Sequence, residues 1–299
     1  MQIFGRGYHM SVKIPVGFLG YGTRALDALM AHGGFEVRYF FAPQSRLNKD
    51  VYDARKRYGD RLKFRLVKDH AQLLELFREC QDVSLFVMNA CPIILKKDAI
   101  EAMQVYNIHP GNLHYNRGHQ PHLWTVFLGE EQSEIVLHTV TTGIDEGGII
   151  AKKQVPITGG MNAGEVLDLL EDEIPYLLDQ LYQYLTDGAF PVESVTGGGY
   201  RPVMGYDDYR IDPEQMDQQG FLEDLDRKIR TRSMHHGAFF YYEDERVYVD
   251  QVLFEEELEA PVSSSGCLVE FHGSVVFLQK GNKRYVLNVK VRKKRNGNE

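Results

Sequence analysis

The feature that most limits the possible folds is a regular alternation of short apolar runs and amphipathic segments in the first third of the chain. Residues 13–22 (KIPVGFLGYG) and 35–43 (FEVRYFFAP) are short, apolar and bounded by Gly or Pro, which is typical of buried strands. Residues 23–34 between them (TRALDALMAHGG) have helical spacing and end in two glycines, as helices often do. Residues 69–80 and 82–91 repeat the helix–strand order. Strands that alternate with helices imply right-handed crossovers between parallel strands, so we expect an α/β fold with a Rossmann-like parallel sheet.

The middle of the chain continues this pattern with two more strands and a helix. Residues 134–157 are predicted to form two strands on either side of the turn GIDEGG. Asn162 and Glu165 then make a capping-box pattern, and apolar residues follow at helical spacing, so a long core helix is expected. Pro175 lies within that helix and should kink it.

A second, smaller domain is predicted at the carboxyl end. Residues 191–220 are rich in Gly, Pro and Asp, as a linker would be, and a helix is predicted at 221–232. Five strand-like segments follow, at 238–243, 246–254, 266–273, 274–280 and 283–291. Closely spaced strands after one helix suggest a small antiparallel, OB-like β-barrel. We therefore expect a large domain over residues 1–200, a linker over 201–215 and a small domain over 216–299.

Bulk composition excludes several classes of protein. The net charge of −8 argues against a protein that coats DNA, and the basic end at residues 290–299 is interpreted as a solvated tail. No apolar run approaches the ~20 residues needed to span a bilayer, so no membrane contact is expected. Three widely spaced cysteines fit a reducing cytoplasm. Met10 is an alternative start, so no helix or strand is predicted for residues 1–11.

Two polar residues stand out at the end of a predicted strand. In the segment YNIHP, Asn107 and His109 are two residues apart, so both side chains point the same way from an extended strand. Parallel sheets place their ligand crevice at this end of the strands. Taken singly, each residue has an ordinary structural explanation, such as a turn cap or a hydrogen-bonded loop histidine. Asp145, in the turn GIDEGG, has the same alternative of stabilising a glycine-rich loop.

Together, these motifs resemble the formyltransferase family that uses 10-formyltetrahydrofolate. The resemblance is carried by Asn-x-His, by the block NIHPGNLHYNRGHQPHLWTVFLGEE (residues 107–131), and by Gly-x-Asp-x-Gly about 35 residues after the histidine. MHHGAFFYYEDERVYV, from Met234, is a looser match to the start of that family's small barrel. The resemblance covers roughly residues 12–291. It implies a catalytic first domain in which Asn107 stabilises an oxyanion, His109 handles a proton and Asp145 orients the imidazole.

The resemblance also implies binding residues for the formyl donor and for the acceptor. FVMNACPIIL (residues 86–95) occupies the place of the strand and loop that carry the folate pterin. The cofactor is expected to be 10-formyltetrahydrofolate, bound by Met88, Asn89, Cys91, Pro92, Ile93, Ile94, Thr142, Gly143 and Ile144. The acceptor is expected to contact Tyr115, Asn116, Arg117, Gly118, His119 and Pro121.

Two other sites suggested by the sequence are less well supported. GYGTRA (residues 20–25) fits a dinucleotide pattern, but the next strand ends Phe-Phe-Ala-Pro without the acid that holds a ribose, so NAD binding is not expected. His114, His119 and His122 lack the helical spacing of a zinc protease site. They are interpreted as loop histidines that contact substrate or solvent, and no metal is expected.

The acceptor is less constrained than the reaction. The segment after the second strand (residues 42–64) lacks the Pro-Ala-Gly-Arg-Gly element of methionyl-tRNA formyltransferases, and Tyr-Asn-Arg-Gly resembles the loop of enzymes that formylate nucleotide-linked amino sugars. A small amine of that kind is favoured, with methionyl-tRNA, an amino acid or hydroxyornithine as alternatives. A formyltetrahydrofolate deformylase and a catalytically silent nucleic-acid binder are the rival classes. The sequence leaves the oligomeric state open.

Overall fold

The structure is a computed structural model that describes residues 13–187, 190–232, 237–262 and 266–293. The chain divides into two compact units. The first comprises residues up to Pro121 together with Gln132–Pro156 and Leu167–Arg201. The second comprises His122–Glu131, Ile157–Val166 and the chain from Pro202 onward. The predicted boundaries at residues 200 and 216 stay a prediction, since independent folding of the two parts is a separate property.

The first unit is built on a seven-stranded sheet in the order β3-β2-β1-β4-β5-β7-β8 among the described residues. Its strands are β1 (Ile14–Gly20), β2 (Phe35–Pro43), β3 (Lys63–Val67), β4 (Leu85–Asn89), β5 (Gln104–His109), β7 (Gln132–Thr139) and β8 (Ile149–Pro156). The pairs from β3 to β5 are parallel, as predicted. The fold class is therefore mixed α/β with a mainly parallel central sheet.

The far end of this sheet adds two antiparallel strands to the predicted parallel sheet. β7 runs antiparallel to β5, and β8 runs antiparallel to β7. For the second of these pairs the cause is the connection: the turn around Asp145 joins β7 and β8 directly, and a short loop cannot make the crossover that parallel strands need. β3 and the helix α2 (Lys49–Tyr58) were not predicted. Both lie at the edge of the sheet, where β3 alternates exposed and half-buried residues and gives no apolar run.

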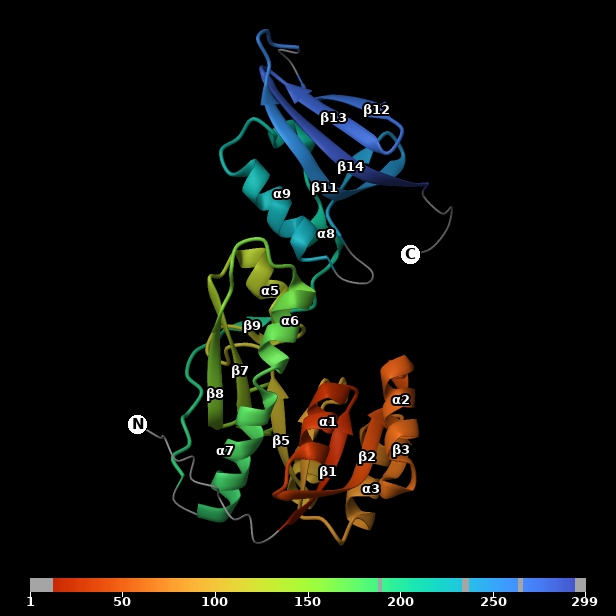
Figure 1. Cartoon of the computed structure of the whole chain (residues 1–299), viewed down its shortest axis with the longest axis vertical. Helices are drawn as coiled ribbons and strands as arrows, with labels where there is room; N and C mark the ends of the chain where they lie inside the picture. Colours follow the sequence, from red (N-terminus) through yellow and green to blue (C-terminus); the bar gives the residue numbers. More distant parts are fainter. Residues whose placement is uncertain (1–12, 188–189, 233–236, 263–265, 294–299) are drawn as a thin grey trace, which may run out of the picture. The chain divides into compact units, whose positions relative to one another are not determined.

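Helices lie on both faces of the sheet (Figure 1). They are α1 (Thr23–Ala31), α3 (His70–Glu79), α4 (Lys97–Ala102) and α7 (Ile174–Asp187). The helix α6 (Ala163–Glu171) precedes α7 and is divided between the two units. Asn162 caps α6 as predicted, accepting from the backbone N–H of Glu165 while Glu165 accepts from that of Asn162. The predicted kink at Pro175 is a break: α6 ends at Glu171 and α7 begins at Ile174, which places the proline in the first turn of a new helix.

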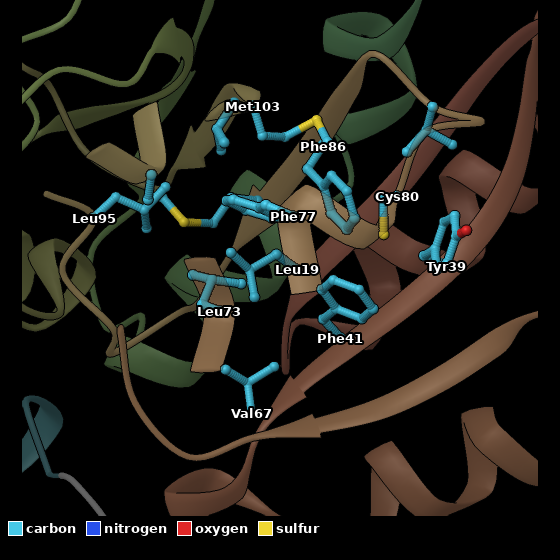
Figure 2. Close-up of a cluster of buried hydrophobic side chains, with 14 residues drawn as sticks. Leu19, Tyr39, Phe41, Val67, Leu73, Phe77, Cys80, Phe86, Leu95 and Met103 are labelled. Atoms are coloured by element: carbon cyan, nitrogen blue, oxygen red, sulfur yellow. The ribbon is translucent and has the colours of Figure 1, made fainter. Parts of the chain in front are cut away.

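The core under α3 and α4 is rich in aromatic rings (Figure 2). Phe86 from β4 lies at its centre, with ring centroids 5.0 Å from Phe41 of β2 and 4.9 Å from Phe77 of α3. Gly17 on β1 makes room for this ring, because a Cβ built there would lie 2.2 Å from a Phe86 ring atom. These contacts hold β1, β2 and β4 in one rigid layer, and the carboxyl ends of β4 and β5 continue from it.

The second unit contains a helix packed on an antiparallel sheet. The sheet has the order β10-β11-β14-β13-β12. The strands of the sheet are β10 (Phe239–Tyr242), β11 (Glu245–Glu257), β12 (Leu268–His272), β13 (Val275–Lys280) and β14 (Lys283–Lys293). The helices of the second unit are α5 (Pro121–Leu128), α8 (Tyr206–Tyr209) and α9 (Phe221–Arg230). Leu225 and Phe221 of α9 meet this sheet, and the Phe221 ring stacks on Tyr285 at 5.7 Å. All five predicted strands are present.

A closed OB-like barrel is not confirmed. β10 and β12 are the two edges of the sheet, and no backbone pairing between them is present in the described part of the chain. Residues 1–12, 234–236 and 294–299 lie outside the described residues, so the alternative start, the loosely matched MHHG segment and most of the basic tail are not described. None of the described helices is both long and apolar enough to cross a bilayer.

Candidate active site

The candidate site lies where β5 ends between β4 and β7. Asn107 and His109 are both buried and both belong to β5. Because side chains alternate along a strand, the two point to the same face, as the sequence predicted. β4 pairs with β5 in parallel and brings Asn89 beside Ile108, whose carbonyl oxygen accepts from the Asn89 side-chain amide at 3.0 Å.

Asp145 reaches this site from the turn between β7 and β8. It adopts a left-handed backbone conformation (φ 52°), which only a tightly held non-glycine residue tolerates. Gly147 lets the turn fold back on β7, because a Cβ there would lie 1.5 Å from the carbonyl oxygen of Thr139. The backbone N–H of Gly118 donates to Asp145 Oδ2 at 2.9 Å. The glycines of GIDEGG therefore serve to turn the carboxylate inward.

The three predicted catalytic side chains are brought together. Asp145 Oδ2 lies 3.5 Å from His109 Nδ1, and Asp145 Oδ1 accepts from the Asn107 side-chain amide at 3.4 Å. The other ring nitrogen of His109, Nε2, lies 3.1 Å from the carbonyl oxygen of Asn116. The carbonyl oxygen and the ionised carboxylate both only accept, so a neutral ring can donate to one of them. The shorter contact, at Nε2, favours the proton there, with Nδ1 facing Asp145.

His138 is a fourth member that the sequence did not single out. It pairs with Asn107 across β5 and β7, is 2% exposed, and its Nε2 lies 3.1 Å from Asn107 Nδ2. Its Nδ1 lies 2.8 Å from the carbonyl oxygen of Thr139, so the N–H is on Nδ1 and Nε2 accepts from the amide of Asn107. The available signal was a histidine inside an apolar strand, IVLHTV, seven residues before a turn aspartate.

Burial dominates the electrostatics of His109. Burial lowers the pKa of the imidazole, and Asp145 and the Asn116 carbonyl oppose this without reversing it. Asp145 favours the charged ring, as the sequence suggested, but its effect on the pKa is smaller than that of desolvation. Burial by itself would raise the pKa of the Asp145 carboxyl, but His109, His138 and the Gly118 N–H outweigh it and hold that pKa well below its usual range. The site at rest pairs a neutral imidazole with an ionised carboxylate.

The predicted donor-binding residues divide into buried and exposed groups. Met88 and Asn89 are buried, and Met88 belongs to the aromatic core. Burial raises the pKa of the Cys91 thiol to about 12, so this sulfur is an unreactive group. The residues of the set that present surface are Pro92, Ile94, Thr142 and Ile144, with Ile93 and Gly143 half-buried. Ile94 is 62% exposed and Ile144 is 42% exposed, which is unusual for isoleucines at the end of a buried sheet.

The predicted acceptor loop is mostly buried. Asn116, Arg117 and Pro121 are buried, His119 and Gly118 are half-buried, and Tyr115 is 39% exposed. The Asn116 amide donates to the carbonyl oxygen of Pro121 at 3.0 Å. Gly118 and Arg117 form the short strand β6 (Arg117–Gly118), which pairs with β9 (Tyr200–Arg201). Tyr115 is thus the member of this set with the most surface to offer a ligand.

The described residues include no group of three or more His, Cys, Asp or Glu side chains suited to a metal ion. His114 is instead engaged by the chain, with Nε2 3.0 Å from Glu193 and Nδ1 3.0 Å from the carbonyl oxygen of Thr196. His119 and His122 are half-buried. Whether the protein needs a metal stays a prediction.

Comparison with protein families identifies the central part of the chain. Residues 54–178 match the formyl transferase family model, and this range contains Asn107, His109 and Asp145. This part is a formyl transferase domain, which confirms the resemblance drawn from the sequence. A methionyl-tRNA formyltransferase from Bifidobacterium longum is 30% identical over 150 residues, covering 49% of this chain and 44% of that protein. The chain therefore matches less than half the length of this relative.

A second relative has a different named acceptor. The dTDP-4-amino-4,6-dideoxyglucose formyltransferase of Mycobacterium bovis is 24% identical over 160 residues, covering 53% of this chain and 68% of that protein. Among solved structures, HypX from Aquifex aeolicus with tetrahydrofolic acid superposes with a TM-score of 0.62 at 15% identity, over 94% of this chain and 44% of that one. A sugar N-formyltransferase from Shewanella superposes with a TM-score of 0.60 at 18% identity, over 80% of this chain and 97% of that one. At these identities, the structural matches establish the fold alone.

Proposed function

We propose that this protein transfers a formyl group from 10-formyltetrahydrofolate to a primary amine. The observation that carries the proposal is the meeting of Asn107, His109 and Asp145 within 3.5 Å at the carboxyl end of β5. The family match over residues 54–178 supports the reaction class. The HypX structure, described as a complex with tetrahydrofolic acid, supports a folate donor.

The reaction is acyl transfer, in which the amine nitrogen bonds to the formyl carbon and the bond from that carbon to N10 of the folate breaks. The amine loses one proton and N10 gains one. His109 is suited to take the amine proton, because its lowered pKa leaves the ring neutral near pH 7. A proton accepted at Nδ1 would lie 3.5 Å from the ionised Asp145, which stabilises the imidazolium that forms.

Asn107 is suited to stabilise the negative charge that develops on the formyl oxygen. An amide N–H cannot ionise, so it can serve as this donor at any working pH. One N–H is held by His138 at 3.1 Å, while the other makes the longer 3.4 Å contact with Asp145. The weaker contact is the one we expect to exchange for the formyl oxygen. Loss of such a donor typically costs about 10²–10³ in rate.

The donor folate is proposed to lie against the loop after β4 and the turn before Asp145. Two exposed isoleucines, Ile94 and Ile144, offer apolar surface from these two segments. Ala90 has a left-handed backbone (φ 53°) that turns the chain after Asn89, at the carboxyl end of β4. An apolar wall beside backbone donors and acceptors suits a flat heterocycle such as a pterin.

For the acceptor, we propose a small molecule, and most specifically a nucleotide-linked amino sugar. The M. bovis relative named for such a substrate and the Tyr-Asn-Arg-Gly loop support this choice. Methionyl-tRNA is the second candidate, because the B. longum relative is named for it. Water as acceptor, which would make the protein a deformylase, is the third.

The experiment is a screen with 10-formyltetrahydrofolate and the full chain, with release of tetrahydrofolate followed by absorbance. The acceptors are dTDP-4-amino-4,6-dideoxyglucose, methionyl-tRNA and buffer alone. Turnover that requires the amino sugar supports the proposal, and turnover that requires the tRNA or neither replaces it. Absence of tetrahydrofolate release with a panel of primary amines, from a protein that is folded and binds the folate, would overturn the reaction itself.

A further inference from the structure

Arg117, predicted to contact the acceptor, makes hydrogen bonds within the protein from both ends of its guanidinium group. Its side chain is 8% exposed. One terminal nitrogen donates to Glu146 at 3.0 Å, and the other donates to the carbonyl oxygen of Gly197 at 3.1 Å. A buried guanidinium needs a carboxylate and carbonyl partners to offset the loss of water, and Arg117 has both. Both ends of the fork are therefore already occupied.

These two bonds join segments that are far apart in the sequence. Glu146 directly follows Asp145 in the turn, and Gly197 belongs to residues 193–201, which end in β9 beside β6. His114 attaches the same segment through Glu193, and Lys152 contacts Glu193 at 2.8 Å. The backbone next to Arg117 also contributes, since the Gly118 N–H donates to Asp145. Arg117 thus lies between a fixed segment and the turn that carries the aspartate.

From this arrangement, which rests on the proposed function, we propose that Arg117 and Glu146 form a positioning pair that holds the Asp145 carboxylate against His109. Asp145 is in a strained conformation, and such a residue keeps its position only if its neighbours hold it. Glu146 is the neighbouring side chain with a buried anchor, while its own carboxylate is about half exposed. Losing the anchor lets the turn relax and moves Asp145 away from the imidazole.

The geometry of the pair favours arginine over lysine. A planar fork can donate in two directions at once, to Glu146 and to the Gly197 carbonyl oxygen, whereas an ammonium group on a flexible stem does not fix both partners. Neither Arg117 nor Glu146 touches the reacting atoms in this assignment. Their effect on turnover passes through Asp145, whose negative charge raises the pKa of His109 against the larger effect of burial.

The test uses Glu146→Gln, Arg117→Lys and the double variant of the full chain. We expect each single change to lower kcat between about 10- and about 100-fold, the size of effect that a misplaced catalytic group produces. The double variant should be no slower than the slower single variant, because both changes release the same turn. Lys49→Gln removes an ion pair on α2, to Asp53, that has no part in this network, and should leave kcat unchanged.

A second readout separates positioning from general destabilisation. Imidazole NMR signals of His109 should titrate at lower pH in Glu146→Gln than in the wild type, because the ring loses the nearby charge of Asp145. Unchanged kcat and unchanged His109 titration in folded Glu146→Gln would overturn the pair. If the wild type transfers formyl to no amine, the proposed function fails, yet the titration still decides whether Glu146 positions Asp145.

Discussion

Asn107 and His138 occupy paired positions on β5 and β7, and the Asn107 amide donates to a histidine nitrogen whose tautomer is fixed by the backbone. The Thr139 carbonyl oxygen accepts a hydrogen bond from the N–H at His138 Nδ1, so in the neutral ring Nε2 can only accept. This fixes which end of the Asn107 side chain carries the N–H groups. An antiparallel neighbour was required for the arrangement, since it brings His138 opposite Asn107 within one hydrogen-bond length.

We therefore expect turnover to depend on an acceptor at position 138. His138→Gln keeps an oxygen that can accept from Asn107, whereas His138→Leu leaves a buried amide N–H without a partner and frees the side chain to rotate. The leucine variant should lose at least about 10-fold in kcat, the equivalent of one hydrogen bond of ~1.4 kcal/mol, and the glutamine variant should lose less. Steady-state kinetics measure both. Equal activity in the two variants would show that Asn107 does not need His138.

The central prediction concerns His109. His109→Asn keeps a polar side chain at this position but removes the titratable ring, so kcat should fall by at least about 10² while folate affinity, measured by calorimetry, changes little. Asn107→Ala should fall comparably, because the developing oxyanion loses its donor. The double variant should lose much less than the product of the two, since both residues act on one transition state. A folded His109→Asn protein with near wild-type turnover would refute the assignment.

Much of the first unit could be predicted because its central strands are apolar on both faces and its helices have clear periodicity. β3 was missed because an edge strand with polar residues on one face has no such run. The two strands around the GIDEGG turn were predicted, and their antiparallel pairing follows from a connection, residues 140–148, that contains no helix. The antiparallel direction of β7 against β5 was not predicted. Because side chains alternate along a strand, the sequence predicted that Asn107 and His109 share one face. No such local rule predicts the contacts of His138 or Arg117. Their partners, Asn107 and Glu146, are about 30 residues away and meet them only after the sheet has formed.

Stability of the first unit should depend on the fit between Gly17 and Phe86. Phe86→Ala removes a fully buried ring and should cost about 3–5 kcal/mol in the free energy of unfolding. Gly17→Ala should cost ~1–3 kcal/mol, because the new methyl group meets that ring at 2.2 Å. In the Phe86→Ala background, the Gly17→Ala cost should largely disappear, since the methyl group then occupies the vacated space. Urea unfolding gives the free energy of unfolding of the wild type, the two single variants and the double variant. If the two single costs simply add in the double variant, β1 shifts to avoid the Phe86 ring and the close fit has no effect on stability.

The lowered pKa of His109 predicts how activity depends on pH. A free imidazole titrates near pH 6.5, and burial places the His109 pKa below that value, so the base stays neutral to lower pH than usual. The acid limb of kcat/KM should therefore lie below pH ~6.5, measured with an acceptor whose own amine titration is determined separately. An acid limb above pH ~6.5, once corrected for the acceptor, would mean that another group is the base.

The same shift predicts a pH dependence of stability. The folded chain binds a proton at His109 more weakly than the unfolded chain does, so below pH ~6.5 protonation favours unfolding. The contribution of His109 to the free energy of unfolding is thus complete above pH ~6.5 and declines as the pH falls through the folded-state pKa. Asp145 acts at more acidic pH, because its own pKa is also lowered and its contribution persists until the carboxylate is protonated. In urea unfolding at a series of pH values, the difference in unfolding free energy between the wild type and His109→Asn should shrink on going from pH 7 to pH 5. A difference that stays constant over this range would show that the imidazole is not buried in its neutral form.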